Sequence, residues 1–170
     1  MKTALLSTLM LTMAASAVSA KGVTIRITLR DSILQTSIDM TDESVLRAFN
    51  VWAGPGTYAN GVEGTNGFII DWPAGIARDR PRGLARYEVK FYVRYLGRPT
   101  EELVYVVLYE HEPDSGRGFV YLPGRSDNDY FRNVRTILHG HGLEGHWFYA
   151  TEAWQTAVNP LLPLTKPSRD

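Results

Sequence analysis

The sequence predicts an all-β fold, mainly antiparallel, built as a β-sandwich or an open barrel with one or two short helices. Roughly six to eight short apolar or alternating segments are joined by turns rich in Gly and Pro, a pattern typical of antiparallel sandwiches and barrels. Helix and strand patterns do not alternate repeatedly along the chain, as a doubly wound parallel sheet would require.

The first elements follow from hydrophobic spacing. Residues 23–30 have an apolar side chain at every second position, which predicts a strand with one face in the core. A weaker alternation at 34–40 predicts a second strand. Asp42 then offers a helix-capping side chain, and the apolar residues after it have helical spacing as far as Trp52. We therefore expect a short helix that ends at Gly54.

Two loops follow this helix. Residues 53–67 are rich in glycine, and a loop of this length inside a compact domain is typically functional or mobile. Residues 68–72 predict a short strand that the next proline stops, and 73–83 form a second loop.

The clearest strands lie in the second half of the chain. Along residues 86–96, apolar and aromatic side chains alternate with mainly charged ones, which predicts a strand. The continuously apolar run at 103–109 predicts a central strand. Residues 113–116 predict a turn, because proline fixes φ and glycine permits positive φ. Residues 119–122 return as the partner strand of a hairpin.

The C-terminal segments are less uniform. Residues 130–138 fit either a helix or a strand, and we favour a strand because the neighbouring segments are strands. A further strand is predicted at 147–150 and a helical turn at 152–157. The prolines beyond this point predict that 159–170 form an extended or disordered tail.

The first twenty residues have the features of a secretory signal peptide. Lys2 gives a positive start, residues 4–15 are mainly apolar, and the small residues at 18–20 fit a cleavage site. The apolar stretch is too short to span a bilayer as a helix. We therefore expect residues 1–20 to be removed near Ala20, and the protein to be periplasmic or secreted.

Composition limits what the remaining chain does. Residues 21–158 are expected to form one domain, and the absence of cysteine is ordinary for a bacterial periplasmic protein. The chain has 18 basic and 18 acidic side chains, so nucleic acid and anionic membranes are poor default partners. No second apolar run reaches membrane length, which predicts a soluble mature chain without a membrane span.

Three histidines suggest a metal site. His139, His141 and His146 lie close together in a glycine-rich segment, and three imidazoles with an open fourth position form a catalytic zinc site. Glu144 would then be a ligand, a partner of a ligand, or a base. The alternative is that these histidines are ordinary polar loop residues, because their spacing matches no established metal motif.

Paired carboxylates suggest a second chemistry. Glu110 and Glu112 are expected to share a face of a strand, as the two carboxylates of a glycosidase would. The alternative is that both lie in solvent at the end of a hairpin, which is the more common situation for charged side chains.

Aromatic side chains suggest a binding role. Trp52, Tyr58 and Trp72 bracket the glycine-rich loop at 53–67, and exposed aromatic rings stack on sugar rings or peptide side chains. The alternative is that the tryptophans close the ends of the core. We expect a non-catalytic protein that binds an unidentified ligand or partner protein in the cell envelope. The alternative function is a metal-dependent hydrolase with a zinc site at the three histidines.

The sequence resembles a set of uncharacterised exported bacterial proteins. The resemblance is carried by phrases rather than by catalytic signatures and covers most of residues 45–155. The phrases are FNVWAGPG at 49–56, YEVKFYV at 87–93, YLPG at 121–124 and GHWF at 145–148, which leads to Ala153 and Trp154. No activity is established for such proteins, so the resemblance implies an exported protein and assigns no functional residue.

Overall fold

The computed structural model describes residues 21–162. The predicted signal peptide at 1–20 and the part of the predicted tail at 163–170 lie outside the described residues.

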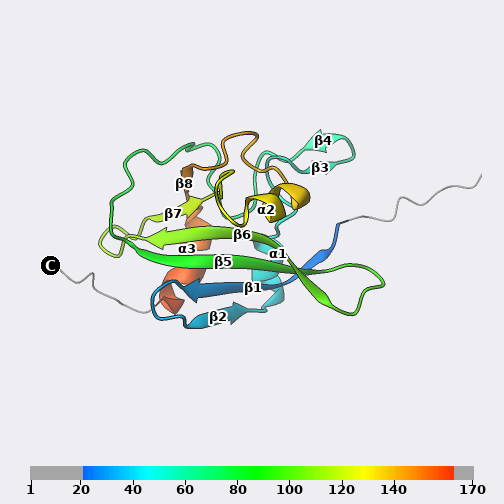
Figure 1. Ribbon diagram of the computed structural model, residues 1–170, viewed down its shortest axis with the longest axis horizontal. Coiled ribbons are helices and arrows are strands. Elements are labelled where there is room, and N and C mark those ends of the chain that lie inside the picture. Colours follow the sequence, from blue (N-terminus) through cyan, green and yellow to red (C-terminus); the bar gives the residue numbers. More distant parts are fainter. Residues whose placement is uncertain (1–20, 163–170) are drawn as a thin grey trace, which may run out of the picture.

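A six-stranded antiparallel sheet forms the centre of the protein, with the strand order β2-β1-β5-β6-β7-β8 (Figure 1). The strands are β1 (Val23–Asp31), β2 (Ser37–Met40), β5 (Ala85–Arg94), β6 (Glu101–His111), β7 (Gly118–Tyr121) and β8 (Trp147–Tyr149). A small ribbon of β3 (Tyr58–Ala59) and β4 (Val62–Glu63) lies within the glycine-rich loop. The predicted class, mainly antiparallel all-β, is confirmed. The predicted strand at 68–72 contributes only an isolated bridge between Ile70 and Ala150.

In the described part of the chain, residues 21–162, three short α-helices accompany the sheet where one or two were expected. They are α1 (Glu43–Ala48), α2 (Tyr130–Thr136) and α3 (Glu152–Val158). Side chains cap two of them: Asp42 accepts the N–H groups of Ser44 and Val45, and Thr151 accepts that of Trp154. Within residues 21–162, no helix is long and apolar enough to cross a membrane.

The core lies on one face of the sheet. Alternate residues of β5 point into it, and Tyr87, Val89, Phe91 and Val93 are all buried. The helices α1 and α3 lie behind the sheet in the view of Figure 1.

Trp154 joins these two helices to the sheet. Its fully buried ring packs edge-on against Phe49 after α1, with ring centroids 5.0 Å apart, and against Tyr109 of β6 at 6.0 Å. Such edge-to-face pairs stabilise aromatic clusters beyond the area they bury.

The preference for a strand at 130–138 is wrong, because Tyr130–Thr136 form α2. The strand β7 pairs with β6 only along residues 108–111 of β6. Helix α2 occupies the next part of that edge (Figure 1). The sequence pattern alone does not show that a helix can take a strand's place at a sheet edge.

Two side chains of α2 make the hydrogen bonds that a neighbouring strand would make. The amide of Asn133, only 2% exposed, donates to the carbonyl of Val106 at 2.6 Å and accepts its N–H at 2.9 Å. The hydroxyl of Thr136 donates to the carbonyl of Val104 at 2.8 Å. These contacts satisfy buried backbone groups of β6 that strand pairing leaves open.

Residues 159–162, part of the predicted tail, are folded against the sheet. Asn159–Leu161 form a 3₁₀-helix, η1, and Leu162 is buried in the core. The hydroxyl of Tyr109 donates to the side chain of Asn159 at 3.1 Å. A polar anchor and an apolar one therefore hold residues 159–162 against the sheet.

We expect Asn133→Ala to lower the free energy of unfolding by about 2–4 kcal/mol, because it leaves the N–H and C=O of Val106 buried without partners. Urea denaturation gives the value. The matched control is Phe131→Ala, an exposed position on the same helix, with an expected change below about 0.5 kcal/mol. Equal losses in the two variants would contradict the role given to Asn133.

Candidate functional site

A buried histidine fixes the start of the glycine-rich loop. His139 is 1% exposed, and its Nδ1 lies 2.7 Å from the carbonyl oxygen of Pro55 while Nε2 lies 3.1 Å from that of Val51. Its ring stacks on Phe68, with centroids 4.6 Å apart. The imidazole therefore joins both ends of the loop to the core.

Burial lowers the pKa of His139 to about 4, because a charged imidazole is poorly solvated in the core. The carbonyls of Pro55 and Val51 act in the opposite direction, since both favour the charged form, but burial is the larger effect. The ring is therefore neutral at pH 7 and carries one proton. We place this proton on Nδ1, which makes the shorter contact and donates to Pro55.

A close backbone approach holds the loop at a second point. Gly56 has a φ of +79°, and a Cβ at this position would lie 2.5 Å from the carbonyl oxygen of Leu138. A side chain would therefore push the loop away from the segment that carries His139.

A cavity of about 430 Å³ lies between this loop and α2. It contains three aromatic side chains and two cations, and none of its lining residues is acidic. The lining residues are Lys21, Trp52, Gly56, Thr57, Tyr58, Tyr95, Arg135, Thr136 and Ile137. We call it the Trp52–Tyr58 cavity. Within residues 21–162, neither Lys21 nor Arg135 forms an ion pair.

The structure brings two of the three predicted aromatic residues to this cavity and places the third elsewhere. Trp72 lines a separate cavity, together with Pro55, Glu63 and His141. Its indole N–H donates to the carbonyl of Gly67 at 3.2 Å. Trp72 therefore closes the loop, while Trp52 and Tyr58 line the candidate site.

Five lining residues lie outside the predicted site and loop: Lys21, Tyr95, Arg135, Thr136 and Ile137. Tyr95 continues the alternation of its strand, and that pattern assigns it to the core face. Arg135 lies in the segment for which a strand was favoured, and Lys21 adjoins the predicted cleavage site. Only tertiary folding brings these five positions together.

The structure does not bring the three predicted histidine ligands together. His139 points into the core, whereas His141 Nε2 lies 2.6 Å from Glu63 and His146 Nδ1 lies 3.0 Å from the carbonyl of Leu143. Within residues 21–162, no group of three or more His, Cys, Asp or Glu side chains could hold a metal ion.

The acidic residues near these histidines bind backbone groups. Glu144 accepts the N–H groups of Gly140 and Gly142 at 2.8 and 2.9 Å, which closes the turn between them. Glu63 accepts the N–H of Gly56 at 2.7 Å, and this bond together with His141 lowers the pKa of the Glu63 carboxyl. Both carboxylates therefore shape loops.

Arginines neutralise the candidate glycosidase pair. Glu110 is 1% exposed and forms ion pairs with Arg80 and with Arg86, the latter at 2.8 Å. Glu112 pairs with Arg117 at 2.9 Å. Neither carboxylate lines a described cavity, and each one is held by guanidinium groups.

Comparison of the chain with protein-family models, with curated proteins and with solved structures gives no match. The candidate site therefore depends on its own geometry.

We expect the stability that His139 contributes to be lost as the pH falls from about 6.5 to about 4. The folded-state pKa of about 4 lies below the ordinary value of 6.5, so the unfolded chain binds a proton more readily within this window. The contribution is complete above the window and amounts to about 3 kcal/mol. Urea denaturation across this pH range gives the measurement.

Two variants separate the pH dependence of stability that His139 causes from that of other titratable groups. His139→Phe should remove this part of the pH dependence, whereas His146→Gln, at an exposed position, should retain it. Burial also lowers the pKa of His111, but this residue is present in every variant and cancels in the comparison. An unchanged pH dependence in His139→Phe would show that the buried imidazole is not its source.

Proposed function

We propose that this chain is a non-catalytic ligand-binding protein of the bacterial cell envelope and that the Trp52–Tyr58 cavity is its ligand site. The envelope location rests on the predicted signal peptide at 1–20. The single observation that carries the binding role is a cavity with aromatic walls and two unpaired cations beside an anchored loop.

The lining chemistry favours a ligand with a ring and a negative charge. Aromatic faces bind sugar or aromatic rings, and a cavity with cations but no carboxylate attracts anions. Lys21 donates to the carbonyl of Tyr58 at 2.8 Å, which keeps its charge at the rim.

The hydroxyl groups of the cavity support binding rather than catalysis. Thr57 donates to the carbonyl of Gly54 at 2.6 Å, and Thr136 donates to that of Val104 at 2.8 Å. The lining contains no His, Asp, Glu, Ser or Cys that could activate a nucleophile or transfer a proton near neutral pH.

Phenyl β-glucuronide and phenyl β-glucoside test this ligand class, because they carry the same rings and differ by one carboxylate. We expect the glucuronide to bind roughly tenfold more tightly, since its carboxylate accepts a charge-assisted hydrogen bond. An NMR titration of backbone amides measures both affinities. The largest shifts are expected around Trp52, Tyr58 and Arg135.

Two variants distinguish the contribution of the positive charge from that of the aromatic contact to glycoside binding. Arg135→Gln should remove most of the preference for the glucuronide, whereas Tyr58→Ala should weaken the binding of both glycosides. Arg82→Gln, an exposed arginine outside the lining, is the matched control and should change neither affinity. Equal affinity for the two glycosides, shifts located elsewhere, or no binding of either compound would contradict the proposed ligand class.

A further inference from the structure

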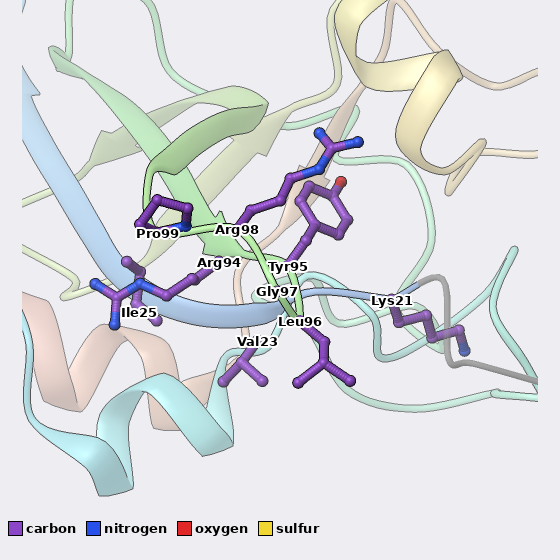
Figure 2. Close-up of a pocket in the computed structure, with 9 residues that line it drawn as sticks. All are labelled: Lys21, Val23, Ile25, Arg94, Tyr95, Leu96, Gly97, Arg98 and Pro99. Atoms are coloured by element: carbon purple, nitrogen blue, oxygen red, sulfur yellow. The ribbon is translucent and has the colours of Figure 1, made fainter.

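A groove of about 900 Å³ lies where β1 begins and the β5–β6 turn projects, and we call it the hairpin groove (Figure 2). Two of its side chains are unusually exposed for large apolar residues: Leu96 at 88% and Val23 at 67%. Figure 2 shows both pointing to the same side.

Strand pairing places these two residues at one end of the sheet. Val23 is the register partner of Arg94, and the turn that carries Leu96 begins directly after this arginine. Two separate segments of the chain thus present one apolar surface. Neighbouring exposed apolar side chains of this kind mark an interaction surface more often than isolated ones do.

Three cations line the hairpin groove together with these apolar residues. Lys21, Arg94 and Arg98 line the hairpin groove, and none of its lining residues is acidic. Arg98 pairs with Glu102 at 2.7 Å, but Lys21 and Arg94 form no ion pair within residues 21–162. The chain as a whole has equal numbers of basic and acidic side chains, so this positive charge is a local property of one edge.

We infer that the hairpin groove docks the protein on an anionic phospholipid bilayer. Leu96 and Val23 enter the interface between headgroups and acyl chains, and Lys21 and Arg94 contact the lipid phosphates. Surfaces that combine apolar side chains with cations bind membranes in this way, through burial of the apolar part and attraction to anionic headgroups.

Charge complementarity favours a membrane over a second copy of this chain. A symmetric dimer places the same surface of both subunits in contact, which would bring the unpaired charges of Lys21 and Arg94 toward their own counterparts. A bilayer that contains anionic lipid supplies the opposite charge. Docking is independent of the proposed ligand, although Lys21 and Tyr95 line both the groove and the Trp52–Tyr58 cavity.

Sedimentation with vesicles tests this inference, with the protein isolated after the cell has exported it so that all variants share one N-terminus. The vesicles contain phosphatidylcholine alone or mixed with phosphatidylglycerol. We expect binding to the mixed vesicles that decreases as salt is added, and much weaker binding to phosphatidylcholine alone.

Two variants separate the contribution of the apolar side chain to vesicle binding from that of the positive charge. Leu96→Ser should weaken binding about tenfold, and Arg94→Gln about fivefold. The matched controls are Ile33→Ser, an 83% exposed apolar residue in the turn at the opposite end of β1, and Arg82→Gln. Both controls should bind the mixed vesicles as the unaltered protein does.

Several results would overturn the inference. These are no binding to the mixed vesicles, equal binding to both kinds of vesicle, and unchanged binding by Leu96→Ser. Size-exclusion chromatography of the same samples tests whether a second copy of this chain occupies the groove instead. A dimer that Leu96→Ser dissociates would assign the hairpin groove to that second copy. Failure of the glycosides to bind would leave the vesicle result unaffected, so the two proposals are tested separately.

Discussion

A neutral imidazole in the core is the constraint on which the candidate site depends. His139 is a polar side chain that the fold buries completely, and it donates to the carbonyl of Pro55 while its other nitrogen faces Val51. Burying a polar group is unfavourable unless a hydrogen bond compensates for lost hydration. The loop supplies that compensation, so the position of the loop and the burial of the histidine are linked.

The position of this loop in turn sets the geometry of the binding surface. The approach of Gly56 to Leu138 holds the loop against the segment after α2, and Trp52, Tyr58 and Arg135 line the same cavity. The hairpin groove adjoins this cavity because Lys21 and Tyr95 line both. One end of the sheet thus carries both proposed surfaces.

Sequence patterns predict the strands and helices whose formation depends mainly on residues close together in the sequence. Alternation predicts β1 and β5, the capping side chain of Asp42 predicts α1, and the apolar run predicts the buried strand β6. The pattern at 130–138 fits a helix as well as a strand, and the position of helix α2 depends on hydrogen bonds that Asn133 makes with a strand distant in sequence.

The candidate site was predicted only in part, for the same reason. Trp52 and Tyr58 stand out as aromatic residues beside a glycine-rich loop, but nothing local relates them to Arg135. The histidines suggest a zinc site because they lie close together in the sequence, yet the chain turns His139 into the core and His141 toward Glu63. The net charge of the chain likewise does not predict the cluster of cations around Arg94, because net charge does not show where charged side chains lie in the fold.

Amide hydrogen exchange in His139→Phe, compared with the unaltered protein, tests most directly whether the imidazole fastens the loop. The amides of Thr57 and Gly64 form hydrogen bonds within the loop, whereas those of Val89 and Val107 lie in the central strands. Our account predicts that Thr57 and Gly64 lose protection while the two strand amides keep theirs. Unchanged protection of the loop amides in the variant would contradict it.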